Sequence, residues 1–184
     1  NAEHHMEILG TAWAREDHHF ILTTDGSGMD GSYIGIGSAW VLQPRSLTRA
    51  DWKEEYRGAC GATRGSVQRA EMMALVDGLR YILVLMGLPT LKDISVGINK
   101  PLRDISEFDP TRRIKVWWVG DRENLILQVA RDRQGMPRFQ RRTEPDLWKQ
   151  FEWLEHVFDI TAVYVPRNTS PEQIVVDEVA GKVR

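Results

Sequence analysis

Four acidic side chains lie at positions where a purely structural pattern would not place an acid: Asp25, Glu71, Asp121 and Asp177. Asp25 follows the apolar and β-branched run 20–24, and Asp121 follows the apolar run 114–119, so each acid ends a predicted strand. Open sheets bind ligands at the carboxyl ends of their parallel strands. These two acids are therefore placed where a site would form.

The other two acids lie on predicted helices. Glu71 shares one helical stripe with apolar or small residues at intervals of three, four, seven, eight and eleven: Ala74, Leu75, Gly78, Leu79 and Ile82. An acid on a core-facing stripe needs a partner for its charge. Asp177 lies about two turns into the final predicted helix, on a face with Ile174, Ala180 and Gly181.

Each acid has a structural explanation when taken alone. Asp25 before Gly26 could form a turn, Asp121 could cap the next helix, Glu71 could pair with an arginine, and Asp177 could be solvated. Gathered at one sheet edge, however, carboxylates raise one another's pKa unless hard divalent cations neutralise them. Two such ions can activate a water and stabilise the leaving oxygen of a phosphoryl displacement. The set predicts a magnesium or manganese site for phosphoryl transfer.

The elements that must position these acids follow a mixed order. Three antiparallel strands come first, then a long helix, and then strands joined by helices, which indicates an α/β fold with one mixed five-stranded sheet and helices on both faces. The sequence Asp-Gly-Ser-Gly at 25–28 predicts a turn after the first strand, and Ser66 is the expected cap of the long helix. The predicted strands are 20–24, 33–42, 52–62, 114–119 and 160–165, and the predicted helices are 68–86, 122–130, 146–156 and 171–183.

Composition limits the class of protein. With 184 residues, 42% hydrophobic and 27% charged, the chain can form one globular domain, so disorder and coiled coil are excluded. Cys60 is the only cysteine, which excludes disulfides within the chain and cysteine-based zinc sites. No apolar run approaches a membrane span, and we expect a cytoplasmic, monomeric protein. We expect one domain over 20–184, an insertion at 88–112, and an N-terminal extension over 1–19 that is partly a cloning remnant.

Four short blocks resemble those of type 1 ribonuclease H, cellular and reverse-transcriptase-associated, in the same order and at similar spacing. The blocks are Thr-Asp-Gly-Ser at 24–27, Gln-Arg-Ala-Glu-Met-Met-Ala-Leu at 68–75, Val-Gly-Asp at 119–121 and Val-Asp-Glu-Val-Ala at 176–180. One block alone would be a weak signal, whereas four in order on matching predicted elements are specific. The resemblance spans about 20–184 apart from 88–112 and implies a ribonuclease H-like fold.

The resemblance implies a two-metal-ion endoribonuclease that hydrolyses the RNA strand of RNA/DNA hybrids. Asp25, Glu71, Asp121 and Asp177 match its catalytic acids, which hold two Mg²⁺ ions, with Mn²⁺ as an alternative. Gly26, Ser27 and Gln68 match substrate-contacting positions, and Arg122 stands where a small polar residue is common. The loop before the last helix lacks the family's histidine, so Arg167 or Asn168 would substitute for it, or turnover would be slower.

Hybrid binding must use a local basic surface, because 24 basic residues against 26 acids give a formal net charge of −2. Residues 131–149 carry an excess of basic side chains, among them Arg138, Arg141 and Arg142, where many family members have a basic substrate-binding segment. This segment is either a reduced version of that surface or a solvated loop. Tryptophans 117, 118, 148 and 153 are expected in the core rather than as base-stacking platforms.

Two other functions compete with this one. A ribonuclease H fold without activity could serve as a nucleic-acid or protein binding module, but such a scaffold has no reason to keep four mutually repelling acids. Another nuclease of the same superfamily, such as a proofreading exonuclease or a junction resolvase, is the second alternative. Exonucleases of that type usually carry Asp-x-Glu on the first strand, where this chain has Asp25-Gly26-Ser27.

Overall fold

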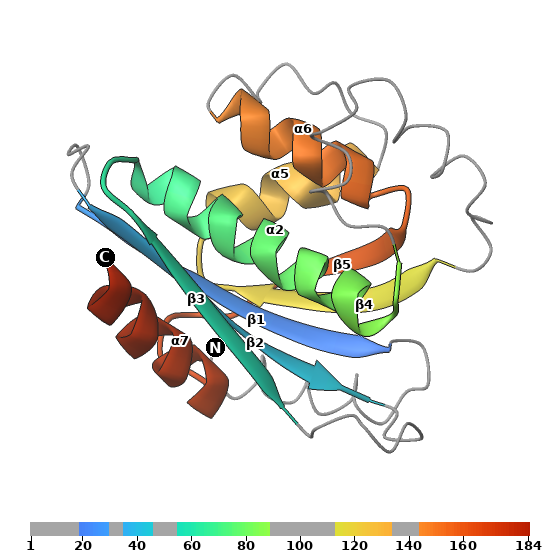
Figure 1. Cartoon of the computed structure of the whole chain (residues 1–184), viewed down its shortest axis with the longest axis horizontal. Coiled ribbons are helices and arrows are strands. Elements are labelled where there is room, and N and C mark those ends of the chain that lie inside the picture. Colours follow the sequence, from blue (N-terminus) through green and yellow to red (C-terminus); the bar gives the residue numbers. More distant parts are fainter. Residues whose placement is uncertain (1–18, 30–34, 46–54, 89–112, 134–143) are drawn as a thin grey trace.

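The chain folds into one five-stranded mixed sheet with helices on both faces. The computed structural model describes residues 19–29, 35–45, 55–88, 113–133 and 144–184. Helices α2, α5 and α6 cover one face, and α7 lies alone on the other among the described helices (Figure 1). The strands are β1 (Phe20–Ser27), β2 (Ile36–Pro44), β3 (Tyr56–Ala62), β4 (Ile114–Gly120) and β5 (Phe158–Tyr164); the helices are α2 (Val67–Leu85), α5 (Glu123–Arg133), α6 (Pro145–Leu154) and α7 (Pro171–Val183).

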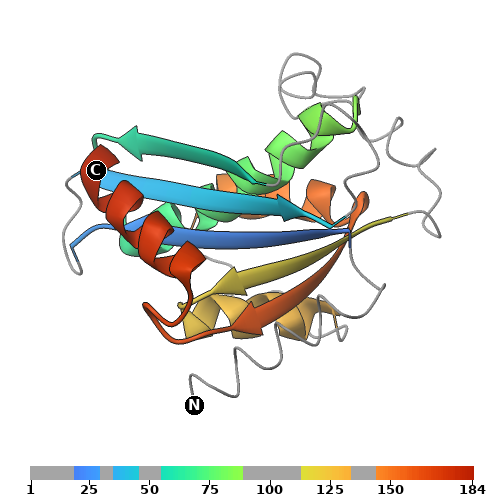
Figure 2. The same ribbon diagram turned by 90° about the horizontal axis from the view of Figure 1, so that it is seen from below.

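The strand order β3-β2-β1-β4-β5 places β1 at the centre. β1 pairs antiparallel with β2 and parallel with β4, while β2–β3 is antiparallel and β4–β5 is parallel. The predicted α/β fold class, with three antiparallel strands followed by helix-linked parallel strands, is confirmed. Figure 2 shows the sheet from below, with α7 crossing in front of its strands.

The predicted turn at 25–28 is wrong for its first three residues. β1 continues through Asp25 and Gly26 to Ser27, because these residues pair with Ala39, Ser38 and Gly37 of β2. A local Asp-Gly-Ser-Gly pattern is typical of a turn, but the ladder to a neighbouring strand extends the strand past it. As a result Asp25 lies within β1, two residues before the end of the strand, rather than in a turn after it.

Other boundaries differ from the prediction by one to four residues, the largest difference being the start of β3 at Tyr56 rather than at 52. β5 begins at Phe158 rather than at 160, and α6 ends at Leu154 rather than at 156, because 155–157 form a turn between them. α5 begins at Glu123 and extends to Arg133, beyond the expected end at 130. Ser66 caps α2 as expected, accepting a hydrogen bond from the Arg69 backbone N–H. Residues 1–18, the predicted insertion apart from Leu88, and 134–143 lie outside the described residues.

The main core lies between the sheet and α2, α5 and α6. Phe20 and Leu22 of β1 pack there with Leu79 of α2 and with Trp118 and Trp148, all buried. Burying large side chains is the main favourable contribution to folding, and it fixes α2 against the central strand. Trp117 is half-buried and Trp153 is buried, so the tryptophans lie in or against the core as predicted. No helix among the described segments is long and apolar enough to cross a membrane.

Candidate active site

Two acids meet because the central strands are parallel. Phe20 and Thr23 of β1 are register partners of Val116 and Val119 of β4, so the two strands end at the same edge of the sheet. Continuing this register by two residues places Asp25 beside Asp121, which directly follows β4. Asp25 is buried and Asp121 is half-buried.

Glu71 reaches the same place from α2, and Gly26 makes this approach close. A Cβ atom at Gly26 would lie 2.4 Å from the Glu71 backbone nitrogen and 2.6 Å from the Ala70 carbonyl carbon, distances that no side chain tolerates. The missing side chain therefore lets the first turns of α2 pack directly on β1. Glu71 is only 5% exposed, and its predicted stripe, Ala74, Leu75, Gly78, Leu79 and Ile82, is buried with it.

Asp25, Glu71 and Asp121 form a compact acidic triad. One carboxylate oxygen of each lies within 4.8 Å of the other two. Among the described residues this is the one group of three or more acidic, histidine or cysteine side chains close enough to share a metal ion. Oxygen ligands at this spacing suit a hard divalent cation.

The triad is electrostatically unfavourable without a cation. The pKa of Asp25 is raised to about 8, mainly by burial and then by the charge of Asp121 and a side-chain hydrogen bond with Asp177. The pKa of Glu71 is raised well above its usual value, mainly by burial and to a smaller extent by the charges of Asp25 and Asp121. The pKa of Asp121 is raised by burial, and the positive charges of Arg167 and Arg122 oppose that rise. These shifts are the cost of holding carboxylates together in a site with little water.

Asp177 lies beside the triad but outside it. Its Oδ1 accepts a hydrogen bond from Arg167 Nη2 at 2.6 Å, and its side chain is 29% exposed. α7 is fixed by a capping box, in which Ser170 and Gln173 bond to each other's backbone. Along the face of Asp177, Ile174 and Gly181 are exposed and Ala180 is buried, while Gln173 and Val176 are buried on the adjoining side of α7.

The remaining predicted contact residues lie around the acids. Arg122 Nε donates a hydrogen bond to Gln68 Oε1 at 3.1 Å. This bond links the chain just after Asp121 to the first turn of α2, which carries Glu71. Ser27 is half-buried at the end of β1, and Asn168 is exposed in the β5–α7 connection with a φ of 57°. The predicted basic positions 138, 141 and 142 lie outside the described residues.

The structure contains a polar cluster between α2 and α6 that the sequence did not predict. Arg69 Nη1 donates to Glu144 at 2.7 Å, Arg69 also forms a two-pronged pair with Asp146, and Ser66 Oγ donates to Glu144 at 2.9 Å. Glu144 has a left-handed backbone (φ 59°, ψ 50°) at the start of α6. The cluster joins the helix that carries Glu71 to the end of the basic segment, and no local pattern marks contacts between residues so far apart in sequence.

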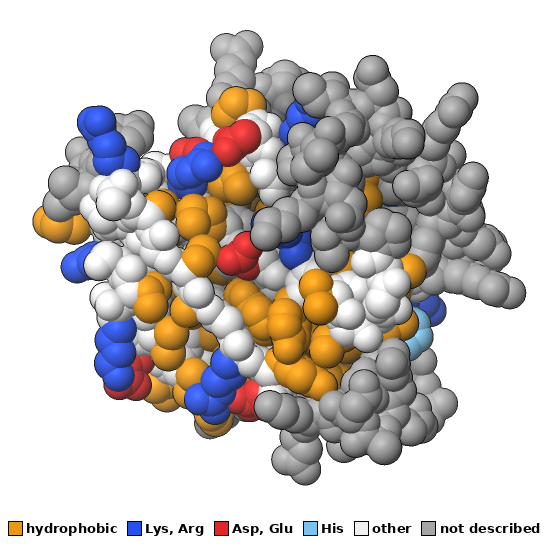
Figure 3. All heavy atoms as spheres, in the orientation of Figure 1, with side chains coloured by type: hydrophobic (Ala, Val, Ile, Leu, Met, Phe, Trp, Pro, Cys, Tyr) orange, Lys and Arg blue, Asp and Glu red, His pale blue; other side chains and the backbone are white. Residues whose placement is uncertain are grey.

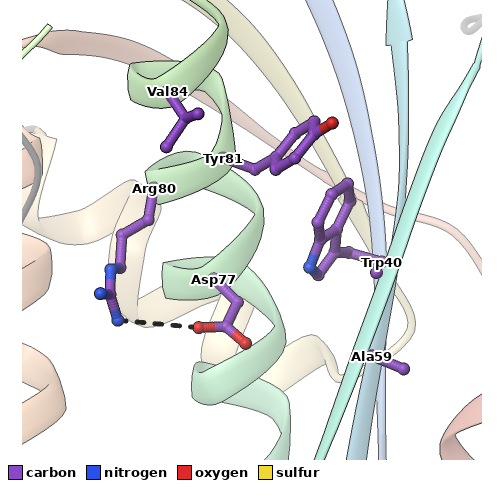
Figure 4. A pocket seen from close by; sticks show the side chains of 7 residues that line it. Trp40, Ala59, Asp77, Arg80, Tyr81 and Val84 are labelled. Carbon is purple, nitrogen blue, oxygen red and sulfur yellow. Dashed lines mark ion pairs between the residues drawn. The ribbon is translucent and has the colours of Figure 1, made fainter.

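A separate pocket lies along α2, away from the acids. Figure 4 shows Trp40 and Tyr81 side by side in this pocket and Asp77 paired with Arg80. The pocket has a volume of about 370 Å³, and the ring centroids of Trp40 and Tyr81 lie 4.9 Å apart. Figure 3 shows hydrophobic side chains gathered on this side of the molecule, and Val84 of α2 is 59% exposed. None of the four acids lines this pocket, so it is distinct from the candidate active site.

Comparisons with known proteins agree with this arrangement at the level of the fold. Neither a protein-family model nor a curated protein matches the chain. Among solved structures, the RNase H1 of the halophilic archaeon Halobacterium salinarum NRC-1 is 18% identical, with 89% of this chain and 96% of that chain covered and a TM-score of 0.52. LC11-RNase H1 in complex with an RNA/DNA hybrid is 19% identical, with 89% and 97% covered and a TM-score of 0.51.

A viral structure gives the same result. The foamy viral protease-reverse transcriptase in complex with dsDNA is 15% identical, with 91% of this chain and 94% of that chain covered and a TM-score of 0.53. At these identities the likeness concerns the path of the chain rather than individual side chains. The chain has the fold of the type 1 ribonucleases H.

Proposed function

We propose that this protein is a metal-dependent endoribonuclease that hydrolyses the RNA strand of RNA/DNA hybrids. The observation that carries the proposal is the acidic triad, in which Asp25, Glu71 and Asp121 place their carboxylate oxygens within 4.8 Å of one another. Asp25 and Glu71 are each 5% exposed, so their charges are largely removed from water. A fold of this kind has no structural need for such a group.

The residues present fit divalent ions. The triad offers only oxygen ligands, as Mg²⁺ and Mn²⁺ prefer. The pKa of Asp25 is raised first by burial and then by the charge of Asp121, so a bound cation would relieve part of this cost. Asp25, Glu71 and Asp121 would hold one ion, and Asp25 with Asp177 would contribute to a second. When bound, two ions supply the positive charge that activates a water and stabilises the leaving oxygen of a phosphodiester.

The protein's own side chains supply orientation around the acids. Gln68 and Arg122 are joined by a hydrogen bond next to Glu71, so together they offer amide and guanidinium N–H donors at the mouth of the site. Arg122 is suited to a phosphate, because its guanidinium carries a permanent charge. Gln68 can contact the 2′-hydroxyl or a base edge, and the 2′-hydroxyl is the group that distinguishes RNA from DNA.

The solved structures support the substrate class. LC11-RNase H1 was solved with an RNA/DNA hybrid, and the foamy viral enzyme with dsDNA, so proteins of this fold accommodate double helices. In this chain Asp25 lies on β1, Glu71 on α2 and Asp177 on α7, and Asp121 directly follows β4. We therefore propose hybrids rather than single strands as the substrate.

A cleavage assay tests the proposal. The substrates are an end-labelled RNA/DNA hybrid, an RNA duplex, a DNA duplex and each single strand, in Mg²⁺, Mn²⁺ or chelator. We expect cutting of the RNA strand of the hybrid alone, only with metal. Asp121→Asn, which keeps side-chain volume, should reduce the rate by at least about a hundredfold, in the range of losses seen when a group that stabilises transition-state charge is removed. Glu178→Gln, an exposed acid on α7, is the matched control and should cut at the wild-type rate.

Four results would overturn the proposal. Cutting in chelator would exclude the metal mechanism, and wild-type activity of Asp121→Asn would exclude the acidic triad. Binding of the hybrid without cutting in either metal would favour a binding module instead. Cutting of DNA strands or of RNA duplexes at a comparable rate would point to another nuclease of this fold.

A further inference from the structure

Arg167 is held at the acidic site by the connection between β5 and α7. The Val165 backbone N–H donates to the Gly120 carbonyl at 3.0 Å, which ties the connection to the end of β4. Thr169 Oγ1 donates to the Pro166 carbonyl at 2.6 Å and closes the turn around Arg167. Because Asp121 follows Gly120 directly, this turn brings Arg167 to the strand ends that carry the acids.

Arg167 contacts the fourth acid and influences two others. Its Nη2 donates to Asp177 at 2.6 Å, and Asp177 raises the pKa of Arg167, with smaller contributions from Asp25 and Asp121. The Arg167 side chain is 68% exposed, so the guanidinium lies at the entrance of the site rather than inside it. The Arg167 guanidinium therefore places a positive charge at the solvent-exposed side of the acidic cluster.

Asp177 lies between this guanidinium and the triad. It shares a side-chain hydrogen bond with Asp25, yet it is absent from the group of acids whose oxygens all lie within 4.8 Å of one another. A cation that bridged Asp25 and Asp177 would therefore have to compete with Arg167 for the Asp177 oxygens. The first ion, held by the triad, would meet no such competitor.

We infer that Arg167 is a stand-in cation that neutralises Asp177 while the second metal position is empty and is displaced when the second ion binds. The inference rests on the proposed two-metal function and deepens it. Arg167 is thus a positioning residue that sets the metal concentration at which the site becomes complete. An exposed ion pair contributes little free energy, so a divalent ion can break it, and the effect on metal affinity is modest.

Equilibrium binding of Mn²⁺ to metal-free protein, followed by electron paramagnetic resonance of the free ion, tests the inference without measuring cleavage. The variants are Arg167→Gln, which keeps a hydrogen-bond donor but loses the charge, and Arg167→Lys, which keeps the charge. Lys182→Gln is the matched control, because Lys182 is an exposed cation on α7 that pairs with Glu178. Thermal unfolding of the metal-free proteins is the second measurement.

We expect two Mn²⁺ sites in the wild type. Arg167→Gln should tighten the weaker site about threefold to fivefold, leave the tighter site unchanged, and lower the melting temperature of the metal-free protein. Arg167→Lys should fall between wild type and Arg167→Gln, and Lys182→Gln should match the wild type. A residue with only a structural role in the turn would not tighten metal binding when removed.

The failures are distinguishable. Wild-type protein that binds no Mn²⁺ would overturn both this inference and the proposed function. Two Mn²⁺ sites with unchanged or weaker second-site affinity in Arg167→Gln would overturn the inference alone. Reduced hybrid affinity in that variant, with unchanged Mn²⁺ binding, would also overturn it and make Arg167 a phosphate contact.

Discussion

Asp25→Asn should make the metal-free protein more stable while removing its activity. Asp25 is buried in the central strand, where burial, the charge of Asp121 and its contact with Asp177 raise its pKa to about 8. An asparagine keeps the shape and keeps an oxygen for the Gly26 backbone N–H, which now donates to Asp25 Oδ1 at 2.9 Å. Its amide can donate to the neighbouring carboxylates, and it carries no charge.

The magnitude follows from the shift in pKa. The ordinary pKa is 3.8 and the value in the folded protein is about 8. At pH 7 the folded protein must take up a proton at Asp25 or hold a disfavoured charge, and each pKa unit corresponds to about 1.4 kcal/mol. The interval from the ordinary pKa to pH 7 gives an upper limit of about 4 kcal/mol. If half of that is recovered by Asp25→Asn, the melting temperature rises by about 4–8 °C for a chain of this size.

The sign of the pH dependence provides an internal control. Because the pKa of Asp25 is raised on folding, its contribution to stability is present below about pH 4 and is lost as the pH rises toward 8. The wild type should therefore lose stability over this range faster than Asp25→Asn. We expect a small difference between the two proteins at pH 5 and the largest difference at pH 8.

Thermal unfolding at pH 5 and pH 8, with chelator or with Mg²⁺, measures these differences. Mg²⁺ should raise the melting temperature of the wild type at pH 8, since a ligand that binds only the folded state stabilises it, and it should raise that of Asp25→Asn much less. Glu178→Gln should stay within about 2 °C of the wild type, as expected of an exposed site. Lower stability of Asp25→Asn in chelator at pH 8, or an equal difference at both pH values, would refute the reasoning.

Two further substitutions test the packing around the site. Gly26→Ala should lower the free energy of unfolding in urea by about 2 kcal/mol or more, because its Cβ would lie 2.4 Å from the Glu71 backbone. Gly28→Ala is the control and should lower it less, because its Cβ would meet only side-chain and Val67 backbone atoms at 3.2 Å or more. Equal losses in the two variants would contradict the close approach of α2 to β1. Glu144→Ala should destabilise the protein, because it removes the partner of Arg69. Glu144→Gly should be about 1 kcal/mol more stable than Glu144→Ala, because glycine accepts the left-handed backbone at this position. The opposite order of stability in the same unfolding experiment would exclude backbone strain at residue 144.

The strand-end acids could be predicted because their position depends on local features. Apolar runs fix where β1 and β4 lie, and two parallel neighbours must bring Asp25 and Asp121 together. Glu71 could be predicted because its stripe is unambiguous over nearly three turns of α2. In both cases the pattern of burial along one element determines the direction of the side chain.

The buried side of α7 could not be predicted, because this helix carries apolar residues on several sides. Ile174 is 51% exposed, Val175 and Val179 are half-buried, and Val176 is buried, so sequence alone does not determine which side meets the sheet. The ion pair with Arg167 depends on that choice. Likewise the extension of β1 through Gly26 depends on pairing with β2, which a local turn pattern does not reveal.

The balance of charge at the site gives the last argument for a cation. Four carboxylates meet two arginines among the described residues of the site, Arg122 and Arg167, and Arg167 is mostly exposed. When ionised, the acids therefore exceed the nearby positive charge by two, and a nucleic-acid phosphate would increase the excess. No rearrangement of these side chains can remove it. If the site binds a polyanion as proposed, divalent ions would offset this excess, and we expect substrate binding and metal binding at this site to strengthen each other.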